Sequence, residues 1–151
     1  SGTTTTMVVD PLRDAENPGT GCVCYGITPT VTTLNQFGGN FILQSAGTIT
    51  TLENAGGLTQ IDTGTLTTCN LRSPASRVDW RSTTTLTTLR VYKGIFDASE
   101  SAAARTITSS EVHQGGIMDL YNGADNITRT NNTVKYGGVV NDVAGSYAFS
   151  P

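Results

Sequence analysis

Hydrophobic and polar positions repeat along the chain in a regular order. A strand-like pattern, Thr-apolar-Thr-Thr-apolar, occurs four times, and two shorter copies follow it with start-to-start spacings of 18, 17, 20, 21 and 20 residues. Because side chains alternate between the two faces of a strand, each copy predicts an apolar side chain on one face and threonines on the other. The copies begin at Thr30, Thr48, Thr65, Thr85, Thr106 and Asn126.

A turn and a second apolar segment follow each copy. Glycines precede this segment in five copies, as in Gly38-Gly39 and Gly56-Gly57, whereas Ser73-Pro74-Ala75 stands in the third. Glycine readily adopts the positive φ that a sharp corner requires. The pattern therefore predicts the order strand, turn, strand and loop for each unit.

A unit of this size cannot bury its own apolar face, so successive copies must stack on one another. We predict an all-β parallel β-helix, or β-solenoid, of about six rungs over residues 30–141. At a rung spacing of about 4.8 Å the stack is on the order of 29 Å tall, with threonine ladders outside. The expected inner column is Val31, Ile49, Leu66, Leu86, Ile107 and Ile127.

Two positions depart from the repeat in ways that predict local consequences. Ser110 and Thr130 stand where earlier copies have a second leucine, so the fifth and sixth rungs are expected to be less regular. Cys69 occupies the same column in the third copy, which is typical of a packed and unreactive thiol. With Cys22 and Cys24 it makes an odd set without ligand-like spacing, so no disulfide framework and no metal site is predicted.

The two ends do not fit the repeat. Residues 1–29 are interpreted as an N-terminal arm and cap, and residues 142–151 as a C-terminal cap or tail. An open solenoid end exposes unpaired backbone groups, so a capping segment or a partner is expected at each end.

Composition supports this interpretation and narrows the function. The chain has 151 residues, of which 27 are threonine and 17 glycine, as expected for strands and tight turns in one domain. A net charge of −3 with only 14% charged residues provides no basic field, so nucleic acid is not an expected partner. The sequence contains no run of 18 apolar residues, so it predicts no membrane-spanning segment.

Four aspartates suggest a column on the outer face of the second strands, since each follows an apolar residue: Asp62, Asp79, Asp97 and Asp119. Carboxylates stacked one rung apart repel each other by about 0.9 kcal/mol in bulk water, so a compensating partner is expected. The candidates are nearby arginines, a bound Ca²⁺ or solvent. The arginines are Arg77, Arg81, Arg90 and Arg105.

No catalytic, cofactor-binding or metal-binding residue is predicted. His113 lies beside a glycine corner without an associated Ser or Cys nucleophile. Trp80 could be an outward anchor at an interface or a lid over a corner, and we favour contact with a partner. The chain is therefore not expected to be an enzyme.

The recurring phrase Thr48-Ile49-Thr50-Thr51-Leu52 followed by Ala55-Gly56-Gly57 resembles β-helix segments of tailed-bacteriophage virion proteins that decorate the capsid or form fibres. The resemblance covers residues 30–141. It implies a small structural protein that forms a homotrimer on the capsid surface and clamps subunits of the major capsid protein. It also implies a terminal arm along the shell, which here would be Ser1 to about Cys22.

The leading hypothesis is therefore a structural virion protein, a capsid decoration or cement protein that stabilises the head lattice. The alternative is a tail fibre or spike that binds or cleaves host surface polysaccharide, for which the Asp column, Trp80 and Tyr92 are the candidates. The sequence leaves open the handedness, the oligomeric state, head or tail location, and whether Ca²⁺ or arginine balances the acids.

Overall fold

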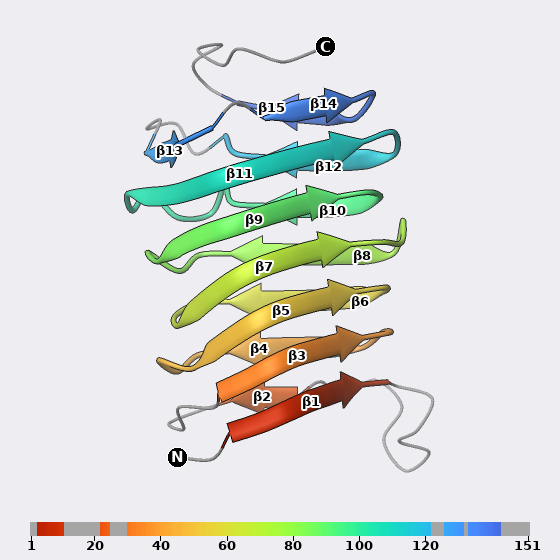
Figure 1. Cartoon of the computed structure of the whole chain (residues 1–151), viewed down its shortest axis with the longest axis vertical. Helices are drawn as coiled ribbons and strands as arrows, with labels where there is room; N and C mark the ends of the chain where they lie inside the picture. Colours follow the sequence, from red (N-terminus) through yellow and green to blue (C-terminus); the bar gives the residue numbers. More distant parts are fainter. Residues whose placement is uncertain (1–2, 11–21, 25–29, 122–125, 132, 143–151) are drawn as a thin grey trace.

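The computed structural model describes residues 3–10, 22–24, 30–121, 126–131 and 133–142. These residues form two parallel sheets that face each other along a β-solenoid (Figure 1). The strands are β1 (Thr3–Val9), β2 (Cys22–Cys24), β3 (Thr30–Gln36), β4 (Asn40–Leu43), β5 (Thr48–Asn54), β6 (Gly57–Ile61), β7 (Thr65–Leu71), β8 (Ser76–Trp80), β9 (Thr85–Val91), β10 (Gly94–Asp97), β11 (Arg105–His113), β12 (Gly116–Asp119), β13 (Ile127–Arg129), β14 (Val134–Tyr136) and β15 (Val139–Asn141).

Each strand pairs in parallel with its equivalent one rung away. Sheet A has the order β1-β3-β5-β7-β9-β11-β13, with β14 also paired to β11, and sheet B has the order β15-β12-β10-β8-β6-β4-β2. The rungs from β3–β4 to β11–β12 are complete, which confirms the predicted parallel solenoid and comes close to the predicted six rungs. The front strands run rightward and the rear strands leftward as the chain climbs in Figure 1, so the coil is right-handed.

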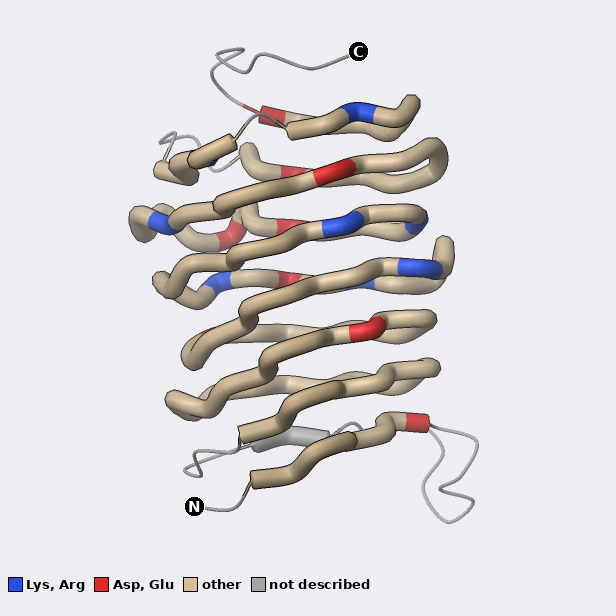
Figure 2. The backbone as a smooth tube through the Cα atoms, viewed as in Figure 1, with Lys and Arg blue, Asp and Glu red and all other residues tan. Residues whose placement is uncertain are grey.

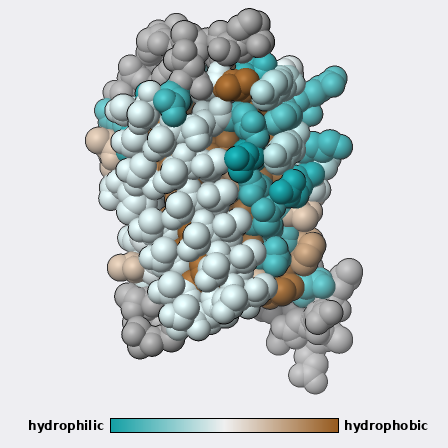
Figure 3. Space-filling view, viewed as in Figure 1, coloured by the Kyte–Doolittle hydropathy of each residue, from teal (hydrophilic) through white to brown (hydrophobic). Residues whose placement is uncertain are grey.

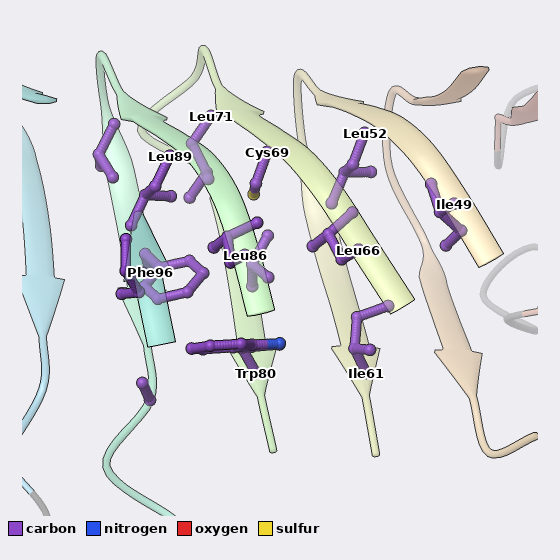
Figure 4. Packing of buried hydrophobic residues seen from close by; sticks show 14 of the residues in the cluster. Ile49, Leu52, Ile61, Leu66, Cys69, Leu71, Trp80, Leu86, Leu89 and Phe96 are labelled. Carbon is purple, nitrogen blue, oxygen red and sulfur yellow. The ribbon is translucent and has the colours of Figure 1, made fainter. Parts of the chain in front are cut away.

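The core between the sheets consists of the predicted columns. Val31 pairs with Ile49, and Ile49 with Leu66, all of them buried. Cys69 is fully buried between Leu52 and Leu89, as predicted, and burial raises the pKa of its thiol far above the usual range. Figure 4 shows these side chains meeting those of sheet B in one continuous layer. The thiol is thus a neutral packing group.

The described part of residues 1–29, which the sequence predicts to be an arm and cap, forms strands β1 and β2 at the end of the stack. β1 pairs with β3 and β2 with β4, so both strands extend the solenoid by a rung. Met7 lies beside Leu34 in the core column, and Thr4 takes the place that Val31 has on the next rung. The repeat was hidden because that inner position is polar and because a long insertion separates β1 from β3. Residues 143–151 of the proposed C-terminal cap lie outside the described residues.

The register of the last rung also differs from the prediction. Ile107 faces Arg129 rather than Ile127, because β13 is shifted by two residues and Ile127 lies beside Arg105. Ile127 is nevertheless buried. The predicted irregularity is confirmed for the sixth rung, since β13 and β14 pair with the two ends of β11 and leave Ser110 between them. It is wrong for the fifth rung, because β11 is continuous and stays in register with β9.

Glycines form the corners that the sequence predicts. Gly39, Gly57, Gly94, Gly115 and Gly137 all have φ between 65° and 89°. Close approach of the rung below adds a second constraint at only some of them. A Cβ atom on Gly94 would lie 2.3 Å from the carbonyl oxygen of Ser76, whereas the nearest atom to one on Gly115 is 3.8 Å away.

These two corners give a matched prediction. Gly115→Ala should destabilise the fold by about 1–3 kcal/mol through backbone strain alone. Gly94→Ala should lose clearly more stability, because its methyl group would also collide with the backbone of Ser76. Urea unfolding midpoints of the two variants test this, and equal losses would show that close approach contributes nothing.

Candidate functional site

The predicted Asp column exists on the outer face of sheet B with three of its four members. Asp79 pairs in register with Asp97, and Asp97 with Asp119. Gln60 precedes them and Asn141 follows them in the same column. The fourth predicted member, Asp62, lies two residues beyond Gln60 on the same rung and is not part of the column. The prediction failed there because Thr59, not Ile61, is the inward residue that matches Val78.

Arginine balances two of these acids. The Arg77 Nε donates to Asp79 Oδ1 at 2.7 Å, and its Nη2 donates to Asp97 Oδ2 at 2.7 Å. Asp97 also accepts the backbone N–H of Ser99 at 2.8 Å and its hydroxyl at 2.6 Å. Asn141 Nδ2 donates to Asp119 at 3.0 Å. The arginine alternative is therefore confirmed for Asp79 and Asp97.

The other candidate arginines have different roles. Arg81 bridges Asp62, at 3.2 Å, and Glu100. Arg90 pairs with Glu111 at 3.0 Å. Arg105 is buried in the core. Among the residues that the structure describes, no group of three or more His, Cys, Asp or Glu side chains is placed to hold a metal ion.

Burial raises the pKa of Asp79 above its ordinary value, and Arg77 only partly opposes this effect. The folded chain therefore binds more protons than the unfolded chain between the two pKa values, and this group's contribution to stability should fall as pH rises through that window. Asp79→Asn should remove the fall. The free energy of unfolding of both proteins is measured from pH 3 to pH 7. The difference between the two curves isolates the contribution of Asp79, which should fall from about pH 4 upward. A flat difference curve would contradict the raised pKa.

An aliphatic column runs beside the acids on the same face of sheet B. Leu58, Arg77 and Ile95 are aligned, and Ile117 and Val139 continue the column. Exposure increases toward the C-terminal end, from half-buried Ile95 to Ile117 at 38% and Val139 at 55%. The outer face of sheet B thus combines exposed aliphatic side chains with a paired acidic row.

A stacked ladder lies at the corner after the sheet A strands. The guanidinium of Arg72 lies over the Tyr92 ring at 5.1 Å, and the Tyr92 and His113 rings are 4.6 Å apart. His113 stacks on Tyr136 at 4.7 Å. His113 is the last residue of β11 and lies directly before the glycine corner at Gly115. Tyr136 ends the ladder with 53% of its surface exposed.

Trp80 is not an outward anchor, and the prediction that it contacts a partner is wrong. It is fully buried against Phe96, with ring centroids 5.9 Å apart, because its position in β8 points inward (Figure 4). Arg105 lies over the indole ring at 5.1 Å and donates to the carbonyl groups of Trp80 and Ala98, and to that of Ser101 at 2.7 Å.

Two buried polar clusters were not anticipated from the sequence. Near the N-terminal end, the Gln36 amide donates to the Leu58 carbonyl at 2.8 Å, and the Asn54 amide donates to the Thr59 hydroxyl at 3.1 Å. At the other end, Arg129 pairs with Asp142 at 2.9 Å and donates to Thr133 at 2.6 Å. Their only sequence signal is a polar residue at an inner position of the repeat.

No model of a known protein family matches this chain, and neither a curated protein nor a solved structure matches it. The described part of the chain contains no helix capable of crossing a membrane.

Proposed function

We propose that the chain is a structural virion protein of the capsid-decoration type, located on the capsid surface as a homotrimer and bound to the major capsid protein. The observation that carries this proposal is the outer face of sheet B, where Ile117 and Val139 are exposed beside an acidic row. Exposed aliphatic patches with polar surroundings are typical of protein interaction sites.

The stack supplies the mechanics of such a role. Every strand from β3 to β12 is hydrogen-bonded on both sides, so Ile117 of the docking face lies within the paired stack, and Val139 lies on the edge strand β15. Repeated copies on one lattice gain avidity without strong single contacts. An N-terminal arm contributes less to this proposal than the sequence suggested, because Thr3–Val9 belongs to sheet A.

Co-sedimentation with capsids tests the proposal. The purified chain should sediment with heads assembled from the major capsid protein of the virus that encodes it. Ile117→Arg combined with Val139→Arg should abolish this, whereas Thr50→Arg on the opposite sheet should not. Absence of wild-type binding would refute the function, and intact binding by the double variant would refute the docking face. Sedimentation velocity of the free chain tests the trimer.

A second candidate is binding of host polysaccharide by a tail fibre or spike. The observation that favours it is the corner ladder, where the exposed ring of Tyr136 stacks on His113, whose Nε2 lies 3.7 Å from Glu111 Oε1. The residues that suggested polysaccharide binding from the sequence give it little support, since Trp80 is buried and Asp79 and Asp97 form ion pairs with Arg77. A glycan array with wild type and Tyr136→Ala distinguishes it, since binding lost in the variant would favour the fibre role.

A further inference from the structure

Two columns of threonine cover the outer face of sheet A. Strands β1, β3, β5, β7, β9 and β11 each carry a Thr-x-Thr triplet, and the triplets lie in register from rung to rung. The central residue is buried from β3 to β11, and the last triplet consists of Thr128 and Arg129 of β13 with Thr130 directly after the strand. The first column is Thr3, Thr30, Thr48, Thr65, Thr85, Thr106 and Thr128, and the second is Thr5, Thr32, Thr50, Thr67, Thr87, Thr108 and Thr130. In the described chain their hydroxyls make no hydrogen bond with one another.

The register of β13 preserves this array. A direct continuation of the repeat would place Ile127 beside Ile107, but Thr128 lies beside Thr106 instead, and Arg129 takes the inner position. The inner residue thus varies from Thr4 to Arg129 while the outer pair stays threonine. This uniformity lies on the outside of the molecule.

Ladder formation alone does not require this uniformity. Sheet B has the same parallel stacking, yet its outer columns contain several residue types, and the longest run of one type is the three aligned aspartates. One of them is Asn40, Leu58, Arg77, Ile95, Ile117 and Val139. Sheet B is therefore an internal control showing that the fold tolerates varied outer side chains.

The threonine array is free of charge. The outward charged side chains Glu53, Arg90 and Glu111 lie toward the carboxyl ends of their strands (Figure 2). Arg105 and Arg129, which also belong to sheet A, are buried. Figure 3 shows the array as a broad pale area bordered by a hydrophilic strip. The area also lacks the aromatic and arginine anchors that dominate protein interfaces. A partner that is complementary to this face should itself present a neutral and regular surface.

The spacings of the array define that partner further. Neighbouring rungs are about 4.8 Å apart, and residues i and i+2 on one strand are about 6.7 Å apart. The result is a rigid two-dimensional grid of hydroxyl and methyl groups, whose two spacings are close to oxygen repeats on the prism faces of hexagonal ice. We propose that the threonine face of sheet A binds ice. This goes beyond the proposed function and uses the face opposite the proposed docking surface.

Partition into ice tests the proposal on the isolated chain. Purified protein is slowly frozen onto a cold probe, and the fraction in the ice is compared with that of a non-binding protein of similar size. Wild type should be enriched in the ice and should inhibit ice recrystallisation. Thr50→Lys combined with Thr87→Lys should reduce both to the level of the non-binding protein, because lysines disrupt the grid at exposed positions.

Three controls make the result decisive. Asn40→Lys, an exposed position on sheet B, should leave ice partition unchanged. Thr50→Val keeps the β-branched shape and should retain most of the partition, and thermal melting confirms that each variant is folded. Exclusion of wild type from ice would overturn the proposal, as would equal loss in Asn40→Lys. A dimer that Thr50→Lys dissociates, without ice partition, would identify the face as a self-association surface. None of these results depends on capsid binding.

Discussion

Trp80→Ala should reduce the free energy of unfolding by about 3–5 kcal/mol, the range for removing a large buried aromatic side chain. Trp80 is fully buried and fills the space between the sheets next to Phe96. The variant would also take away the ring over which the Arg105 guanidinium lies. Since domains of this size are stable by only about 5–15 kcal/mol, the loss should be visible as a large fall in the urea midpoint.

Two further variants separate packing from other causes. Trp80→Phe keeps a ring in the same place and should lose much less stability, because the indole N–H has no hydrogen-bond partner in the described chain. Tyr121→Ala removes an aromatic side chain that is 54% exposed and should have little effect. A loss for Trp80→Ala no larger than that for Tyr121→Ala would contradict its place in the core.

The predictability of this fold follows from its repetition. Leu34, Leu52 and Leu89 recur at a constant place in each unit, so stacking them was the only way to bury them together. Glycine corners such as Gly57 were predictable for the same reason, because positive φ restricts the residue type. Periodicity therefore gave the sheets, the core column and the corners.

Residues outside the period could not be placed in this way. β1 carries Thr4 at an inner position and is separated from β3 by a long insertion. Its membership in sheet A is therefore apparent only from the strand pairing in the three-dimensional structure. Trp80 and Asp62 were misplaced because counting from the apolar residue of a short strand does not fix which residue points inward. The sequence predicted the threonine ladders of sheet A. Their contrast with the varied outer face of sheet B could be recognised only once the register of both sheets was known.

The buried ion pair at the C-terminal end should show a strong dependence between its two partners. The side chains of Arg129 and Asp142 are only 2% and 9% exposed, and their Nη2 and Oδ2 atoms lie 2.9 Å apart. Arg129→Met or Asp142→Asn alone should destabilise the fold by about 3–5 kcal/mol, because each breaks a buried ion pair. The double variant should lose far less than the sum, since the interaction between these two side chains is lost only once.

The exposed pair of Arg90 and Glu111 is the matched control. Its partners are 3.0 Å apart but 41% and 27% exposed, so the same double-mutant cycle should give a coupling of about 0–1 kcal/mol. Urea unfolding of all variants at pH 7 measures both cycles. Additive losses at Arg129 and Asp142 would show that solvent screens this pair as well. Strong coupling between Arg129 and Asp142, with weak coupling between Arg90 and Glu111, would mean that charge balance stabilises the polar end of the core. At that end the apolar column stops, and Arg129 takes the place next to Ile107.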